Sequence, residues 1–326
     1  MPRSRKFHPA RSVLFVTTSL EEGLLFKPNT LIRTILVSCL AKAQALYSVR
    51  ICHFLFEENH VHLVLVVDDP EDVSDFMGRF KTESAHAINR LLGRRKRTVW
   101  CEGYDSPILG SPVDVIKEIV YLYTNPSKDD LVDSIVDYPN LSTWDNYTTK
   151  EHKIACIPYN RRAIHKLSSL NPTEDEISSH VQRLEEEYPD RIELELSPDG
   201  WLEIMEVPEG DWIKINERIV SMVHKADKRY FKKRENAGKK SIGRERLETS
   251  PINLNHRSTR KGKRSYCISS SISLRVHIIR TVKALINEGK EILTRWREGD
   301  HSCRYPIGIY PPSLPLFGNL MPGVVV

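Results

Sequence analysis

Long apolar runs are missing from this 326-residue sequence. No uninterrupted apolar run exceeds the five residues from Leu63 to Val67, whereas a helix needs about 20 to span a bilayer. The basic segment from Met1 to Arg11 is followed by the apolar stretch Val13 to Val16, which is too short for the apolar part of a signal peptide. We therefore expect no transmembrane helix and a cytoplasmic protein.

Paired cysteines are missing as well. The cysteines are scattered singly, without the Cys-x-x-Cys spacing of zinc modules, and they are too sparse for a disulfide scaffold. We expect reduced, mostly structural thiols at Cys39, Cys52, Cys101, Cys156, Cys267 and Cys303. With 40% hydrophobic residues, the chain has enough apolar material for one large domain or two ordinary ones. This composition argues against a globally disordered chain and against a fibrous protein.

Charge is distributed unevenly, although the formal net charge is only +5. The segment from Thr173 to Asp211 carries a net charge of −12, and the segment from Lys225 to Arg264 carries +11. A second basic cluster extends from Arg90 to Arg97. Local positive charge of this size attracts polyanions, so two separated basic patches favour nucleic acid as a partner. A solvated, partly disordered linker explains the longer basic segment equally well.

The N-terminal part of the chain alternates between strand and helix patterns. Apolar residues at period two or in short runs predict strands, and apolar residues at helical spacing predict helices. We predict strands over Ser12–Thr18, Val49–Phe56 and Val61–Val67, and helices over Asn29–Leu46, Glu71–Leu92 and Ser111–Asn125. The short segment from Glu57 to Asn59 suits a hairpin turn. This order favours an α+β fold: a ferredoxin-like antiparallel sheet with helices on one face.

The C-terminal half gives weaker signals. Helical spacing predicts helices over Thr173–Tyr188, Trp212–Lys232 and Ile272–Arg297, and the Pro- and Gly-rich stretch Tyr305–Val326 predicts an irregular tail. We divide the chain into a sheet domain over residues 1–148, an acidic mixed helical region over 149–224, a basic linker, expected to be flexible, over 225–264, and a C-terminal helix with its tail over 265–326.

A pair of histidines opens the third predicted strand, in the sequence Asn59-His60-Val61-His62. Side chains two residues apart on a strand share a face, so His60 and His62 project together while Val61 faces the other layer. Two adjacent imidazoles form half of a metal site. A His-x-His pair also arises often by chance, so two polar residues on a half-exposed strand are the plain alternative.

The predicted helix from Ser111 to Asn125 separates into an apolar and a polar arc. Tyr123 shares the apolar arc, and we interpret it as a core residue. Tyr121 shares the polar arc with Asn125, one helical turn away. A tyrosine with a carboxamide at this spacing can act as a nucleophile beside a metal ligand. A partly exposed tyrosine near a helix end is the commoner situation.

Several short motifs occur in a characteristic order over about residues 7 to 144. They are Ser12–Thr18 with Leu25-Phe26, Asn59–Leu63, Asn89-Arg90, Arg97–Trp100, Tyr121–Pro126, Leu131-Val132 and Tyr138-Pro139. This series resembles the REP-associated tyrosine transposases, which are single-tyrosine HUH nucleases (His, hydrophobic, His) acting on single-stranded DNA hairpins. Farther on, Ser241–Leu247 and Arg295–Asp300, followed by Tyr305–Tyr310, resemble the C-terminal extension of a longer-chain branch.

The resemblance implies a site and a reaction. It implies an HUH nuclease domain over residues 1–148. In this domain His60 and His62 would bind a divalent metal, Mg²⁺ or Mn²⁺, with Asn125 as a third ligand. Tyr121 would be the nucleophile of a DNA strand transferase that cleaves and rejoins single-stranded or hairpin DNA through a 5′-phosphotyrosine intermediate, as a monomer or homodimer. Two imidazoles suit Mn²⁺ at least as well as Mg²⁺, which prefers oxygen ligands.

Two departures from the family's usual sequence lie beside this site. Glu57-Glu58 replaces the usual Met-Pro before the histidine motif, and can add an acidic group near the metal. Ser127–Asp130 replaces the usual Val-Arg-Ala-Gly after Asn-Pro, which removes an arginine that is a candidate DNA contact.

Basic side chains from both patches are our candidates for phosphate contacts: Arg90, Arg94, Arg95, Lys96, Arg97, Lys232, Lys233, Arg234, Lys239 and Lys240. Trp100 and Tyr104 can stack on unpaired bases, although burial is the commoner fate of aromatic residues. The main alternative is a nucleic-acid-binding protein of the same fold that does not cleave. A zinc hydrolase built on the two histidines would lack a carboxylate-rich second half and would not need Tyr121.

Overall fold

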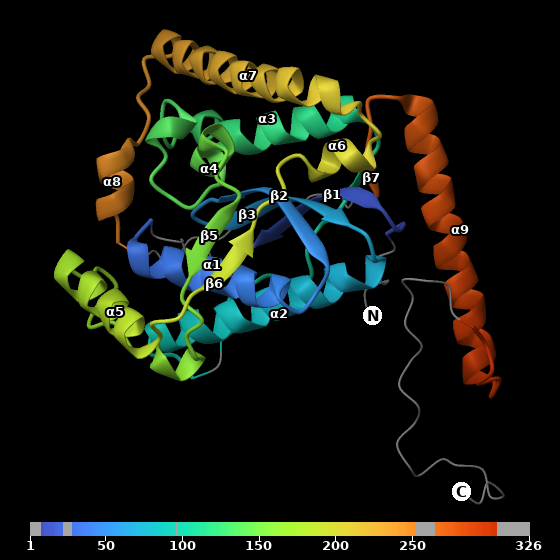
Figure 1. The fold of residues 1–326 in the computed structure, drawn as a ribbon, viewed down its shortest axis with the longest axis horizontal. Coiled ribbons are helices and arrows are strands. Elements are labelled where there is room, and N and C mark those ends of the chain that lie inside the picture. The colour runs from blue at the N-terminus through green and yellow to red at the C-terminus, as the bar shows by residue number, and fades with distance from the viewer. Residues whose placement is uncertain (1–7, 22–27, 96, 252–264, 305–326) are drawn as a thin grey trace, which may run out of the picture.

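A computed structural model gives the structure of the chain and describes residues 8–21, 28–95, 97–251 and 265–304. Its centre is a five-stranded sheet with the strand order β2-β3-β1-β4-β7 (Figure 1). Neighbours are antiparallel from β2 to β4, and β7 joins β4 in parallel. The strands are β1 (Ser12–Ser19), β2 (Val49–Phe56), β3 (His60–Val67), β4 (Ile108–Leu109) and β7 (Cys267–Ile268).

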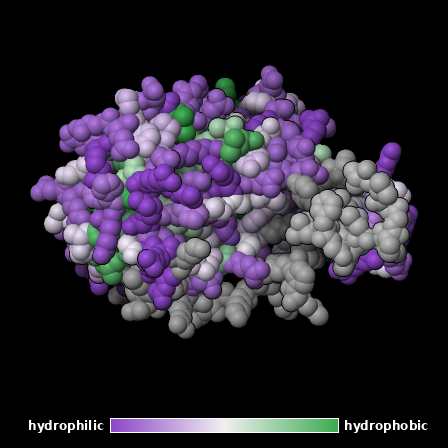
Figure 2. Space-filling view, turned by 90° about the horizontal axis from the view of Figure 1, so that it is seen from below, coloured by the Kyte–Doolittle hydropathy of each residue, from purple (hydrophilic) through white to green (hydrophobic). Residues whose placement is uncertain are grey.

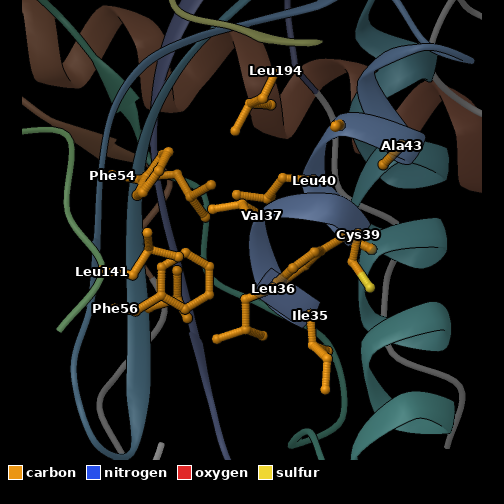
Figure 3. Close-up of a cluster of buried hydrophobic side chains, with 14 of the residues drawn as sticks. Ile35, Leu36, Val37, Cys39, Leu40, Ala43, Phe54, Phe56, Leu141 and Leu194 are labelled. Carbon is orange, nitrogen blue, oxygen red and sulfur yellow. The ribbon is translucent and has the colours of Figure 1, made fainter. Parts of the chain in front are cut away.

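Helices α1 (Thr30–Gln44) and α2 (Pro70–Leu91) cover one face of the sheet (Figure 1). In Figure 3, Leu36 and Leu40 of α1 lie toward β2, where Phe54 and Phe56 are drawn, and Ile35 is drawn farther from that strand. All five side chains are fully buried. Burial of side chains of this size contributes about 1.5–3 kcal/mol each, so this layer is a main source of stability. The surface seen from below is mostly hydrophilic, because the apolar faces of these elements turn inward (Figure 2).

Helix α3 (Pro112–Lys128) covers the opposite face, with α6 (Gly200–Ile204) and α7 (Glu209–Asn236) (Figure 1). The structure thus confirms the expected α+β class with an antiparallel sheet at its centre and a largely helical C-terminal region. It differs in placing helices on both faces. The reason lies in β3, where Val64 and Val66 on one side are as apolar as Leu63 and Leu65 on the other, so each side needs a covering layer.

Residues of the C-terminal region complete the sheet at both edges. At one edge β7 adds to β4 as the outer strand. At the other edge the Ser197 N–H donates to the Ile51 carbonyl of β2 at 2.8 Å. The C-terminal region is therefore built into the sheet instead of being attached beside it.

The remaining elements surround this core. They are α4 (Trp144–Thr149), β5 (Lys153–Cys156), α5 (Glu174–Glu187), β6 (Ile192–Glu195), α8 (Arg244–Thr249), α9 (Ile272–Arg297) and 3₁₀ helices over Ile135–Asp137 and Arg161–Ala163. All six cysteines lie in described residues, and none forms a disulfide, as expected. Within the described ranges, none of the helices combines the length and apolarity needed to cross a bilayer.

The segment expected to be a basic linker is largely helical where the structure describes it. Residues 225–236 continue α7, and α8 follows after a short connection. This difference arises because α7 buries Ile219 and Val223 against α3, which leaves its lysines toward solvent. Residues 252–264 and the tail over 305–326 lie outside the described residues.

His53 of β2 gives the fold a pH dependence. Its Nδ1 lies 2.8 Å from the Oη of Tyr123, and complete burial lowers its pKa from 6.5 to about 3. Above pH 6.5 its contribution to stability is complete. As the pH falls from 6.5 toward 3, this contribution is lost, because His53 becomes protonated in the unfolded chain but stays neutral in the folded chain.

Replacing His53 with glutamine should therefore reduce the loss of unfolding free energy between pH 7 and pH 5 by about 2 kcal/mol. Urea unfolding at the two pH values measures this difference. His152→Gln is the matched control, because His152 is exposed. Equal losses in the wild type and in His53→Gln would contradict the prediction.

Candidate active site

His60 and His62 stand on the same face of β3, as their spacing predicts. Their Nε2 atoms are 3.0 Å apart. The Nδ1 of His60 lies 2.6 Å from Asn59 Oδ1, and the Nδ1 of His62 lies 2.9 Å from Thr17 Oγ1 on β1. The carboxamide oxygen of Asn59 favours protonation of His60 at Nδ1, and the Thr17 hydroxyl can accept from the same tautomer of His62, in which each Nε2 carries a lone pair for a metal.

Burial keeps this pair uncharged at neutral pH. It lowers the pKa of His60 from 6.5 to about 4. The pKa of His62 is well below its usual value, first through burial and then through the positive charge of His60 and Lys128. Neutral imidazole is the form that coordinates metals.

Asn125 and Tyr121 reach this pair from α3. The helix begins at Ser111, the N-cap residue. The Asn125 Nδ2 lies 3.3 Å from the Nε2 of both histidines. The Tyr121 ring lies 5.6 Å from the His62 ring and 6.1 Å from the Phe15 ring, centre to centre. The site thus joins one strand to one helix.

The two tyrosines of α3 have the different environments that the helical arcs predict. Tyr121 is partly exposed, whereas Tyr123 is fully buried. The Tyr123 Oη is within hydrogen-bond distance of His53 and lies 2.9 Å from Thr143 Oγ1. Tyr123 is therefore a core residue with occupied polar partners, and Tyr121 is the phenol that faces the histidines.

Lys128 is a member of the site that we missed in the sequence. Its Nζ lies 4.7 Å from the centre of the Tyr121 ring and 3.4 Å from Asn125 Oδ1. Burial raises the pKa of Tyr121, and the positive charge of Lys128 acts in the opposite direction. The sequence signal was the spacing of seven from Tyr121 and three from Asn125, which we overlooked because we ended the helix before Pro126.

Glu57 is a second residue of the site that sequence reasoning noted only as an acidic neighbour. It is 3% exposed, and its Oε2 lies 3.6 Å from His60 Nε2. Burial raises its pKa well above the ordinary range, with Asp129 and Glu58 adding to the shift. Its Oε1 has no hydrogen-bond partner. A buried carboxyl group in this state is costly unless a proton or a cation compensates it.

Two imidazoles and a carboxamide fit a divalent metal. Nitrogen ligands about 2.1 Å from one metal are roughly 3.0 Å apart at right angles, which matches the observed His60 to His62 spacing. In the structure Asn125 turns its Nδ2 toward the two Nε2 atoms and its Oδ1 toward Lys128, so the amide would have to turn by about 180° to give a metal its oxygen. In the described part of the chain, no ready group of three or more His, Cys, Asp or Glu side chains is arranged as metal ligands.

Residues 23–122 match the family model described as Transposase IS200 like. This segment is under a third of the chain, and over it the chain is similar to the IS200-like transposases. The matched segment contains His60, His62 and Tyr121 and ends before Asn125. A solved structure of a REP-associated tyrosine transposase bound to a REP hairpin is 19% identical, with a TM-score of 0.39, and the match covers 46% of this chain and 87% of that one. No curated protein matches this chain.

The basic cluster after α2 is only partly exposed. Arg95 and Arg97 are exposed and line a cavity of about 410 Å³. Arg90 donates to the backbone carbonyls of Arg162 at 2.9 Å and Ile164 at 3.1 Å, so it ties α2 to a later segment. Arg94 is half-buried, and Lys96 lies outside the described residues.

The aromatic residues that follow this cluster are buried or half-buried in the fold. Trp100 is 4% exposed, and its Nε1 donates to Ser84 Oγ at 3.0 Å. Tyr104 is half-buried, with its Oη 3.3 Å from Ser74 Oγ. Of the two expectations for Trp100, base stacking or burial, the structure shows burial.

Helix α7 carries the second basic surface of the protein, which we call the α7 groove. It has a volume of about 510 Å³ and is lined by Lys225, Lys228, Arg229, Lys232, Lys233 and Asn236. Lys239 and Lys240 follow it and are exposed as well. The α7 groove lies on the helix that packs against α3, so it flanks the layer that carries Tyr121.

Arg234 corrects our list of candidate DNA contacts. It is 5% exposed and donates to the carboxylates of Asp130 at 3.2 Å and Asp133 at 2.8 Å. It also donates to the backbone carbonyls of Ser127 and Val132. Its guanidinium is thus occupied by the segment that follows α3, and Arg234 is a structural residue. Charge in the sequence does not distinguish a buried arginine from an exposed one.

Proposed function

We propose that this chain is a transposase-type DNA strand transferase that cleaves and rejoins single-stranded or hairpin DNA through a phosphotyrosine intermediate. The observation that carries the proposal is the position of Tyr121 beside the His60 and His62 pair. The match of residues 23–122 to the family model described as Transposase IS200 like supports it.

His60, His62 and Asn125 would hold a divalent metal, Mn²⁺ or Mg²⁺. When bound, this metal supplies positive charge that neutralises the phosphodiester. The neutral imidazoles and their fixed Nδ1 partners suit this role, because ligand orientation is set before the metal arrives.

The protein's own contribution to cleavage is the placement of one phenol. Tyr121 Oη attacks phosphorus, the bond from phosphorus to the 3′ oxygen breaks, and that oxygen takes up a proton while the phenol loses one. The products are a 5′-phosphotyrosine and a free 3′-OH, so a second 3′-OH can reverse the step on another strand. Lys128 stabilises the phenolate, and α3 holds the ring in line for attack.

DNA would be held through its phosphates. The exposed side chains available for this are Arg95, Arg97, Lys232, Lys233, Lys239 and Lys240. Such contacts bind with strong salt dependence and little base selectivity. The proposed partner is therefore single-stranded or hairpin DNA, of REP type, bound by a monomer or a homodimer.

The test is to incubate the purified full chain with hairpin DNA and Mn²⁺ and to look for a covalent protein–DNA adduct on a denaturing gel. Label at the 3′ end should remain on the protein and label at the 5′ end should be released, because the link is to the 5′ phosphate. A chelator should abolish the adduct. Label retained from the 5′ end would contradict the proposed polarity, and salt-sensitive binding without an adduct would favour the binding protein that does not cleave.

A further inference from the structure

The buried position of Glu57 in the site is not explained by the fold or by the two histidines. It follows β2 directly, at the turn into β3, and its side chain is almost completely removed from solvent. Its Oε2 lies 3.6 Å from His60 Nε2, and the Asn125 side chain forms a hydrogen bond to it. The carboxylate therefore lies beside one of the proposed metal ligands, although it and the two imidazoles are not already arranged as a ligand set in the described residues.

The surroundings of Glu57 do not neutralise it. Its Oε1 has no hydrogen-bond partner, and Glu58 and Asp129 place further negative charge nearby. Lys128 supplies the opposing charge, but its Nζ lies beside Tyr121 and Asn125 Oδ1. A buried carboxylate with one free oxygen, next to two neutral imidazoles, is an incomplete polar arrangement.

We propose that Glu57 is a further ligand of the divalent metal, so that the site combines two imidazoles, an amide and a carboxylate. This inference rests on the proposed function, since it concerns the same metal. The 3.6 Å between Glu57 Oε2 and His60 Nε2 is close to the roughly 3–3.5 Å between neighbouring ligand atoms on one metal. A carboxylate adds a charged oxygen donor and brings the site nearer to the preference of Mn²⁺ and Mg²⁺.

The competing interpretation is that Glu57 is a protonated, purely structural acid. The two interpretations differ for Glu57→Gln, which keeps the size and hydrogen-bonding capacity of the side chain but removes the charged donor. A structural acid would leave metal affinity unchanged. If Glu57 is a metal ligand, Glu57→Gln should lower the metal affinity. The metal-free variant should then be as stable as the metal-free wild type or more so, because a buried carboxyl group has been removed.

The experiment measures binding of Mn²⁺ alone to the full chain without DNA, by calorimetry and by the spin-resonance signal of free Mn²⁺. Glu57→Gln should weaken Mn²⁺ binding at least about tenfold, whereas the matched control Glu58→Gln should change it less than about threefold. Mn²⁺ should also raise the thermal midpoint of the wild type more than that of Glu57→Gln.

Equal Mn²⁺ affinity in the wild type and Glu57→Gln would overturn the role of Glu57 and leave the proposed function intact. Failure of the wild type to bind Mn²⁺ would overturn both. If Glu57→Gln does not fold, Glu57→Asp provides the test, because it keeps the charge but shortens the reach by one methylene and should weaken binding. If Glu57→Asp and Glu57→Ala both bind Mn²⁺ as tightly as the wild type, the ligand role of Glu57 is excluded.

Discussion

Replacing Tyr121 with phenylalanine is expected to slow formation of the covalent protein–DNA adduct at least about a thousandfold. The substitution removes only the Oη atom. The ring keeps its contacts with Phe15 and His62, and Lys128 stays over its face, so the fold and the metal ligands are unaffected. DNA binding should remain within about threefold of the wild type, because the phosphate contacts come from other side chains. Single-turnover adduct formation and a binding titration separate the two effects.

Tyr123→Phe is the matched control on the same helix. It removes a hydroxyl that lies within hydrogen-bond distance of His53 and Thr143, far from solvent, and should cost about 1–3 kcal/mol of unfolding free energy. The rate of adduct formation should be nearly unchanged in the folded protein. If Tyr123→Phe abolished the adduct and Tyr121→Phe did not, the assignment of the nucleophile would be wrong.

Replacing Arg234 with methionine is expected to lower the free energy of unfolding by about 3 kcal/mol. Arg234 joins α7 to the segment after α3 through two carboxylates and two backbone carbonyls, and methionine keeps the apolar stem but none of these bonds. The loss is moderated because Asp130 and Asp133 are half-exposed and can be hydrated. Urea unfolding of the full chain measures it.

Lys233→Met is the control beside it in the sequence. Lys233 is exposed in the α7 groove, so its loss should leave stability within about 0.5 kcal/mol and reduce the slope of log affinity against log salt for DNA by about one. The folded Arg234→Met protein should keep the wild-type slope. A reversed pattern, with Arg234 affecting the salt slope and Lys233 affecting stability, would contradict the placement of both side chains.

The larger elements could be predicted because their patterns are local. The strand over Val49–Phe56 and the helix over Ile272–Arg297 lie where apolar periodicity placed them. The strand Cys267–Ile268 could not be predicted, since two residues carry no period and depend on β4 as a partner. The layer on the second face also escaped prediction, because α6 and α7 come from a distant part of the sequence.

The candidate site also has features that the sequence could predict and features that it could not. The pairing of His60 with His62 follows from strand geometry, and the separation of Tyr121 from Tyr123 follows from helix geometry; the structure shows both arrangements. The catalytic role of Tyr121 stays a prediction. The burial of Glu57 could not be predicted, because it depends on residues from several elements. It could not be predicted either that Arg234 is buried while its lysine neighbours are exposed, since a count of charges does not report burial.

The completion of the sheet at both edges by C-terminal residues has a consequence for self-association. An outer strand with open N–H and C=O groups is a template on which another molecule can add its own strand. A fragment ending near residue 148 would keep Tyr121 but would lose β7 from one edge, the Ser197 contact from the other, and the cover that α7 gives to α3. Such a fragment is expected to aggregate through its strands, and in the full chain the C-terminal region protects the edges of the central sheet from pairing with other copies.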